Sequence, residues 1–127
     1  MAENKAVLIV DDEESVRLLL QRILEAIPGV AFTLASSGGE AVQLATEHRY
    51  DLILLDLLMP GFDGIQALTQ IRASSANQET RVIIVSVLED PDTRIVCRSL
   101  GVRDYVVKPI NRAALLAAVR AQLDLAA

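Results

Sequence analysis

The sequence predicts an α/β domain built on a parallel β-sheet with helices on both of its faces. Three observations lead to this prediction. Short apolar runs alternate five times with segments of helical periodicity, most of the runs are apolar at every position, and no internal repeat or linker interrupts the pattern. Continuous apolar runs are typical of strands buried on both faces. We expect one domain over residues 1–127, a length close to the commonest domain size.

The five predicted strands are the apolar runs themselves. The clearest begins at Ala6 and ends at Val10, immediately before four acidic residues. The second is weaker, because its residues are less uniformly apolar. In chain order, the strands are expected at residues 6–10, 30–35, 52–55, 82–85 and 105–107.

The first two predicted helices follow the first two strands. The first ends at Pro28-Gly29, and its apolar residues recur at helical spacing at Val16, Leu19, Leu20, Ile23 and Ile27. The second begins at Ser37, which Glu40 follows three residues later as in a capping box. It is expected to run to about His48, which we place on the surface.

Cap residues mark the last three helices. Asp63, Asp90 and Asn111 each precede a segment of helical periodicity. Pro91 then occupies the first position of its helix, and Gly101 ends that helix. The expected apolar faces are Ile65, Leu68 and Ile71 in the third helix, and Leu115, Leu116, Val119 and Leu123 in the fifth.

Composition argues against several classes of function. The formal charge of −5 disfavours direct binding to nucleic acid or to an anionic membrane, since both attract basic surfaces. No apolar run approaches the ~20 residues that span a bilayer, and the N-terminus lacks a signal-peptide pattern. The single cysteine, Cys97, excludes an intrachain disulfide and is expected to pack within the fourth helix. We therefore expect a cytoplasmic domain.

Polar residues follow four of the five predicted strands, namely Asp11 with Asp12, Asp56, Ser86 and Lys108. Because ligands of open α/β sheets bind outside the carboxyl ends of the strands, we expect these side chains to meet at one edge. Three carboxylates in one crevice favour a hard cation such as Mg²⁺. Asp56 is then placed to be a nucleophile toward a phosphoryl group. Lys108 and Ser86 offer an ammonium and a hydroxyl to phosphoryl oxygens.

With these residues in place, the sequence resembles the receiver domain of two-component response regulators over essentially its whole length. The matching residues are Asp11, Asp12, Ser86, Tyr105, Lys108-Pro109, and Asp56 within Leu-Leu-Asp-Leu-Leu-Met-Pro-Gly-Phe-Asp-Gly. The resemblance implies a (βα)5 flavodoxin-like, doubly wound fold of strand order 2-1-3-4-5. It also implies a cis peptide bond between Lys108 and Pro109.

The resemblance further implies a phosphorylation-controlled signalling module rather than an enzyme. Asp56 would accept a phosphoryl group from a sensor histidine kinase or a phosphotransfer protein. The Mg²⁺ ligands would be Asp11, Asp12, Asp56 and the backbone carbonyl of Leu58. Ser86 and Tyr105 would then switch, altering the face made by the fourth helix, fifth strand and fifth helix. That face would reach an output domain or partner, and a homodimer could form on phosphorylation.

Two alternative functions stay open. A phosphatase of the haloacid dehalogenase type also uses an Asp nucleophile, Mg²⁺, Ser or Thr and Lys. It needs a second Asp two residues after the nucleophile, where this chain has Leu58. A receiver-like interaction module that works without phosphorylation is the other alternative. The sequence also leaves open whether the domain stands alone or belongs to a longer protein.

The sequence departs from the family pattern beside the predicted acceptor. Val87 stands where receivers usually have Ala or Gly, so we expect it to narrow the access of small phosphodonors to Asp56. Leu58 and Leu88 flank the expected line of attack by water. Because neither side chain can hydrogen-bond, we expect slow autodephosphorylation. A basic region around the fourth helix is either a partner face or a solvated surface, and it contains Arg94, Arg98 and Arg103.

Overall fold

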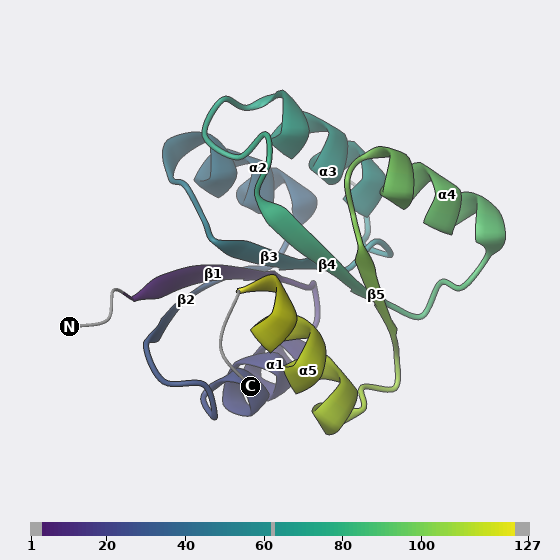
Figure 1. The fold of residues 1–127 in the computed structure, drawn as a ribbon. Coiled ribbons are helices and arrows are strands. Elements are labelled where there is room, and N and C mark those ends of the chain that lie inside the picture. Colours follow the sequence, from purple (N-terminus) through teal and green to yellow (C-terminus); the bar gives the residue numbers. More distant parts are fainter. Residues whose placement is uncertain (1–3, 62, 124–127) are drawn as a thin grey trace.

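The computed structural model describes residues 4–61 and 63–123, in which five strands alternate with five helices (Figure 1). The strands are β1 (Lys5–Val10), β2 (Val30–Ala35), β3 (Leu52–Leu55), β4 (Arg81–Ser86) and β5 (Asp104–Val107). The helices are α1 (Glu14–Leu24), α2 (Gly38–Glu47), α3 (Gly64–Ala73), α4 (Pro91–Ser99) and α5 (Arg112–Gln122). The predicted order of elements is confirmed, and none of the described helices is long and apolar enough to cross a membrane.

The strands form one parallel sheet of order β2-β1-β3-β4-β5, as predicted. In Figure 1, α2, α3 and α4 lie over one face of the sheet, and α1 and α5 lie over the other. The strand order reverses between β1 and β3, since β2 lies on one side of β1 and the later strands lie on the other. A ligand crevice is expected outside the carboxyl ends of the strands at this reversal.

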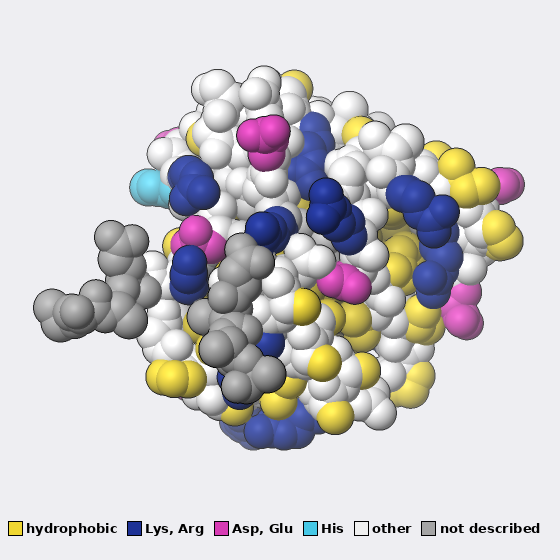
Figure 2. All heavy atoms as spheres, in the orientation of Figure 1, with side chains coloured by type: hydrophobic (Ala, Val, Ile, Leu, Met, Phe, Trp, Pro, Cys, Tyr) yellow, Lys and Arg dark blue, Asp and Glu magenta, His cyan; other side chains and the backbone are white. Residues whose placement is uncertain are grey.

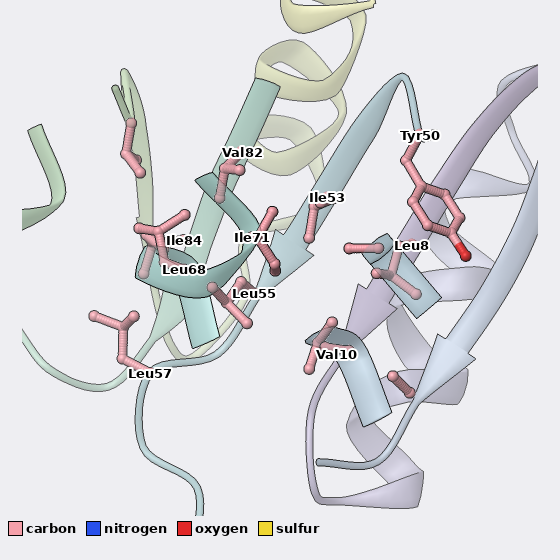
Figure 3. Close-up of a cluster of buried hydrophobic side chains, with 14 of the residues drawn as sticks. Leu8, Val10, Tyr50, Ile53, Leu55, Leu57, Leu68, Ile71, Val82 and Ile84 are labelled. Carbon is pink, nitrogen blue, oxygen red and sulfur yellow. The ribbon is translucent and has the colours of Figure 1, made fainter. Parts of the chain in front are cut away.

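Each face of the sheet has its own apolar core. Leu8 and Ile53 point to the side of α2 and α3, whereas Val7 and Leu54 point to the side of α1 and α5. Figure 3 shows the first of these cores, in which Leu68 of α3 packs beside strand residues. Strand side chains alternate between faces, so strands covered on both sides must be apolar at every position. This explains the continuous apolar runs of the sequence.

The first helix is shorter than predicted. It ends at Leu24, and a tight turn carries the buried Ile27 instead of a last helical turn. Leu19, expected on the apolar face, is 46% exposed, while Leu20 and Leu24 are buried. Adjacent helical residues differ by about 100° in direction, so only one of the pair Leu19 and Leu20 can face the core.

The cap of α2 is half of the predicted capping box. The Ser37 hydroxyl accepts the Glu40 N–H at 3.1 Å, as expected. The Glu40 carboxylate, however, accepts the N–H of Ser36 at 2.7 Å instead of returning to Ser37. The complete capping box belongs to α3, where Asp63 and Gln66 each accept the other's backbone N–H. The predicted caps Asp90 and Asn111 are confirmed.

The loop between α3 and β4 is fixed by a buried polar network that sequence analysis missed. Asn77 is 1% exposed, accepts the Tyr50 N–H at 2.9 Å and donates to the carbonyls of Ala45 and His48. The Thr80 hydroxyl donates to Asn77 at 2.7 Å. These hydrogen bonds satisfy polar groups that are buried from water. They connect the loop to the chain between α2 and β3, at the amino edge of the sheet.

Candidate functional site

Backbone pairing brings the predicted site residues to the carboxyl edge of the sheet. The Asp56 N–H donates to the Val10 carbonyl at 3.0 Å, so Asp56 lies beside Asp11. The Lys108 N–H donates to the Ser86 carbonyl at 2.9 Å, so the ends of β4 and β5 also meet there. The four residues come from four strands, and their proximity follows from the parallel register rather than from any local motif.

Lys108 joins the two buried carboxylates of the site. Its Nζ lies 2.8 Å from Oδ2 of Asp11 and 3.2 Å from Oδ2 of Asp56. Asp11 is fully buried and Asp56 is 4% exposed, so both charges have lost nearly all contact with water. A buried charge needs a partner, and one ammonium serves both carboxylates here. The bond between Lys108 and Pro109 is cis, as predicted.

Three carboxylates form a group of oxygen ligands suited to a hard cation. Ligand oxygens of Asp11, Asp12 and Asp56 all lie within 4.8 Å of one another. Asp12 is exposed, which leaves the group open to solvent on one side. Mg²⁺ binds through a few carboxylates and keeps several waters, so this donor set fits it. The Leu58 N–H donates to Oδ1 of Asp56 at 3.1 Å, while the role expected for the Leu58 carbonyl stays a prediction.

Burial raises the pKa of Asp56, and the negative charge of Asp11 adds to the rise. The Leu58 N–H and Lys108 favour the ionised form but do not cancel the cost of burial. For Lys108, burial alone would lower the pKa, yet its contacts with Asp11 and Asp56 outweigh burial and raise it. The charged form of Lys108 is therefore stabilised by two carboxylates, whereas the charged form of Asp56 is destabilised by burial and by the charge of Asp11.

The two predicted switch residues meet at the backbone of Leu88. The buried Ser86 hydroxyl accepts the Leu88 N–H at 3.3 Å, and the Tyr105 hydroxyl donates to the Leu88 carbonyl at 2.6 Å. The guanidinium of Arg94 lies 4.4 Å from the centre of the Tyr105 ring. Leu88 therefore connects the end of β4 to Tyr105 on β5 and, through Arg94, to α4.

Apolar side chains stand in the loops that follow Asp56 and Ser86. Leu58 is 57% exposed and Val87 is 52% exposed, whereas Leu88 is half-buried against the core beneath α2 and α3. Large exposed apolar residues so close to a charged site offer no hydrogen bond to water. The three positions singled out from the sequence thus differ, because only Leu88 also contributes to packing.

Two further residues shape the site and were given no role by sequence analysis. Gly64 begins α3, and a Cβ there would lie 2.4 Å from the Leu57 Cα and 2.5 Å from the Asp56 carbonyl. Only glycine permits so close an approach to the loop after Asp56. Arg17 donates to the Asp11 carbonyl at 2.7 Å. The position of Gly64 directly after the predicted cap Asp63 was a usable signal for its close approach to Leu57. No local pattern indicates the hydrogen bond from Arg17 to Asp11.

A basic hollow lies beside α4, away from the acidic cluster. It measures about 240 Å³ and is lined by Arg94, Arg98 and Arg103 together with Cys97 and Tyr105. Figure 2 shows dark blue side chains gathered over α4. Cys97 is buried, and burial raises the pKa of its thiol, as suits the predicted packing role.

A larger hollow of about 580 Å³ lies at the amino edge of the sheet, where Lys5, Asp51 and Thr80 are among its lining residues. It contains none of the predicted site residues. Size alone therefore does not select the candidate site, and the cluster of buried charges at the carboxyl edge is the better candidate.

Comparison with known sequences gives one consistent result. The family model described as "Response regulator receiver domain" matches residues 7–120. Transcriptional regulatory protein ResD of Bacillus subtilis is 39% identical over 117 residues, which are 92% of this chain and 47% of ResD. Transcriptional regulatory protein SrrA of Staphylococcus aureus is 38% identical over 120 residues, or 94% and 48% of the two chains. The chain spans about half the length of these curated relatives.

Solved structures give the same result. The receiver domain of sensor histidine kinase PA1611 from Pseudomonas aeruginosa, which carries a magnesium ion in its active site cleft, has a TM-score of 0.84 and 29% identity. The match covers 95% of this chain and 98% of that one. The response regulator domain of Thermotoga maritima CheB has a TM-score of 0.84 and 31% identity, covering 98% and 100% of the two chains.

Proposed function

The chain belongs to the receiver domains of two-component response regulators, and from this premise we propose that Asp56 accepts a phosphoryl group in a Mg²⁺-dependent reaction. One observation carries the proposal. The Lys108 ammonium lies within 3.2 Å of a carboxylate oxygen of both Asp11 and Asp56. A cation is thus already in place beside the nucleophile, where an incoming phosphoryl group would bring negative charge.

Asp11, Asp12 and Asp56 would hold the metal, and the Leu58 carbonyl is the fourth protein ligand we propose. The donor set consists of oxygens only and is open on the side of Asp12, which suits Mg²⁺ better than a softer metal. When bound, Mg²⁺ neutralises charge that develops on the transferred phosphoryl oxygens.

The chain's own residues then perform the transfer. An Asp56 oxygen attacks phosphorus, the new O–P bond forms, and the bond from phosphorus to the donor's histidine nitrogen breaks. The Leu58 N–H and Lys108 both favour the ionised, nucleophilic form of Asp56 against the cost of burial. Lys108, still paired with Asp11, is free to turn toward the phosphoryl group.

The output of the reaction is a change of surface. We infer that Ser86 moves toward the phosphoryl group, which breaks its bond with the Leu88 N–H. Tyr105 loses its carbonyl partner as Leu88 shifts, and it takes another rotamer. The face formed by α4, β5 and α5 changes in consequence, and it contacts the output domain, a partner or a second copy.

Receiver domains of response regulators work with histidine kinases and output domains. We propose that a sensor histidine kinase or phosphotransfer protein is the direct donor here. We further propose that residues 1–127 form a single receiver domain that acts in the cytoplasm without itself binding nucleic acid or membrane. The domain then works as a signalling module rather than as a metabolic enzyme.

Beryllofluoride, a mimic of the phosphoryl group, tests the proposal on the whole chain. With Mg²⁺ present, it should bind and shift the amide NMR signals of Ser86 and Tyr105. The Asp56→Asn variant removes the nucleophilic carboxylate but keeps its shape, and it should show no such shifts. Binding without Mg²⁺, or equal shifts in Asp56→Asn, would contradict the proposal. No binding at all would favour an interaction module that works without phosphorylation.

A further inference from the structure

Asp11 has every polar group of its backbone and side chain engaged. Its N–H donates to the Ala35 carbonyl at 3.2 Å, and its carboxylate accepts the Glu13 N–H at 2.9 Å and the Lys108 ammonium at 2.8 Å. Its carbonyl accepts the Arg17 guanidinium at 2.7 Å. Arg17 therefore fixes the peptide that joins Asp11 to Asp12.

Asp12 has no such support of its own. Its side chain is exposed and makes no hydrogen bond or ion pair with any residue in the ranges 4–61 and 63–123. Its oxygens nevertheless lie within 4.8 Å of ligand oxygens of Asp11 and Asp56. With no side-chain partner, the reach of the Asp12 carboxylate depends on where its backbone places the Cα–Cβ bond. The carbonyl held by Arg17 belongs to the peptide just before Asp12.

The helix dipole gives no reason for an arginine at this position. Arg17 lies in the first turn of α1, where its N–H donates to the Glu13 carbonyl. A cation near a helix N-terminus is opposed by the helix dipole, and acidic residues are preferred there. The short bond to the Asp11 carbonyl explains what this arginine contributes instead.

We propose that Arg17 is a positioning residue for the Mg²⁺ site, because it holds the Asp11–Asp12 peptide so that the unsupported Asp12 carboxylate faces Asp56. The inference rests on the proposed function and adds a residue to it. Mutation of a group that hydrogen-bonds to a metal ligand and orients it typically lowers the metal affinity by about 10- to 100-fold. Arg17 acts through the peptide that joins two proposed ligands. Its loss should therefore displace the carboxylate of Asp12 more than that of Asp11.

A titration of the metal-free chain with Mg²⁺ alone tests the proposal. The Mg²⁺ affinity is measured by calorimetry and by the shifts of the amide NMR signals of Asp12 and Glu13. Arg17→Met keeps the apolar stem and should weaken Mg²⁺ binding by about tenfold or more. Arg17→Lys keeps the charge with one donor group and should fall between. Arg22→Met is the matched control, because Arg22 is exposed in the last turn of the same helix, and it should stay within about twofold of the parent.

Arg17→Met with Mg²⁺ affinity equal to or higher than the parent overturns the proposal. A higher affinity would mean that Arg17 matters only as a repelling charge. Lost phosphotransfer from a kinase with unchanged Mg²⁺ affinity would assign Arg17 to kinase contact and also overturn it. If Arg17→Met does not fold, Arg17→Gln is judged by the same criterion. Failure of the parent chain to bind Mg²⁺ would instead refute the proposed function itself.

Discussion

At the scale of single residues, we expect the side chain of Leu58 to affect how long a phosphoryl group stays on Asp56. Its side chain is 57% exposed and cannot hydrogen-bond to an attacking water. Leu58→Asn adds such a group without disturbing the core. One hydrogen bond worth about 1 kcal/mol in the transition state corresponds to about fivefold in rate. We therefore expect phosphoryl-Asp56 to decay several times faster in this variant, as measured by loss of ³²P label without a phosphatase.

Leu18→Asn is the control for this change, since Leu18 is similarly exposed but lies on α1. It should leave the decay rate unaltered. A phosphoryl half-life of only seconds in the parent chain would contradict the underlying prediction of slow loss. Leu88 is the poorer position for the experiment, because it packs against the core and a polar residue there would also destabilise the fold.

We expect Val87 to limit the entry of small phosphodonors by its bulk. Its branched side chain is 52% exposed in the loop after Ser86. Val87→Ala removes two methyl groups, and their loss costs little stability at an exposed position. We expect phosphoramidate to phosphorylate the variant faster than the parent, while the rate from a histidine phosphotransfer donor changes less. Equal rates from phosphoramidate in the two chains would show that Val87 does not limit access.

At the scale of elements, the approach of α3 to the loop after Asp56 depends on Gly64. A methyl group there would meet the Leu57 Cα at 2.4 Å, and backbone atoms cannot move aside as a flexible side chain can. We expect Gly64→Ala to reduce the free energy of unfolding by about 1–3 kcal/mol, the usual cost of overpacking. Urea denaturation measures it. Gly39→Ala in α2 is the matched control, since nothing lies within 4 Å of its added methyl group.

The control should be neutral or stabilising, because alanine is preferred over glycine inside a helix by about 0.5–1 kcal/mol. Gly64→Ala should also weaken Mg²⁺ binding if the displaced loop carries the Leu58 carbonyl away from the acidic cluster. A variant as stable as the parent would mean that α3 can shift freely over β3.

The contact between Arg94 of α4 and Tyr105 of β5 should bias the rotamer of Tyr105, the predicted switch residue. Arg94 stacks on its ring at 4.4 Å, and cation–π contacts at exposed sites contribute about 0.5–1 kcal/mol. Arg94→Met should thus move the rotamer equilibrium of Tyr105 by roughly two- to fivefold before any phosphorylation. Fluorotyrosine NMR can report it, because the chain has only two tyrosines. Arg98→Met serves as the control, because Arg98 lines the same hollow. An equal shift in both variants would show that the contact of Arg94 with the Tyr105 ring is not the cause.

At the scale of the whole molecule, the parts predicted from sequence are those set by neighbours along the chain. Continuous apolar runs indicated the strands, and Asp63, Asp90 and Asn111 marked helix starts, because these signals act over three or four residues. The meeting of Asp11 with Asp56 followed from the general rule for parallel sheets.

What sequence analysis missed depends on partners far away in the chain. Asn77 bonds to groups 27 and 32 residues distant, and its loop position gave no hint that its side chain would be buried. Leu19 and Leu20 are equally apolar, so only the packed helix shows which of them faces the core. Arg17 looked like an ordinary helix residue until its bond to the Asp11 carbonyl was seen.

The stability of the whole fold should depend on pH and Mg²⁺ through Asp56. Its pKa is raised by burial, so the folded state prefers the neutral form. This contribution is fully present below the unfolded pKa of about 3.9 and is lost as pH rises through the higher folded value. At neutral pH and without metal, ionised Asp56 therefore destabilises the fold. Asp56→Asn keeps the neutral shape and leaves Lys108 paired with Asp11.

In metal-free buffer at pH 7, we expect Asp56→Asn to melt several degrees above the parent, since each 1 kcal/mol corresponds to about 2–8 °C for domains near this size. The difference should vanish below pH 4, where the parent carboxyl is protonated as well. Saturating Mg²⁺ should reverse the order, because it binds the chain that retains all three carboxylates more tightly and so stabilises it more. Calorimetric melting with and without Mg²⁺ measures both effects. An unchanged or lower melting temperature at pH 7 would mean that repulsion from Asp11 and burial do not strain the fold, and that Lys108 alone suffices to compensate the buried charges.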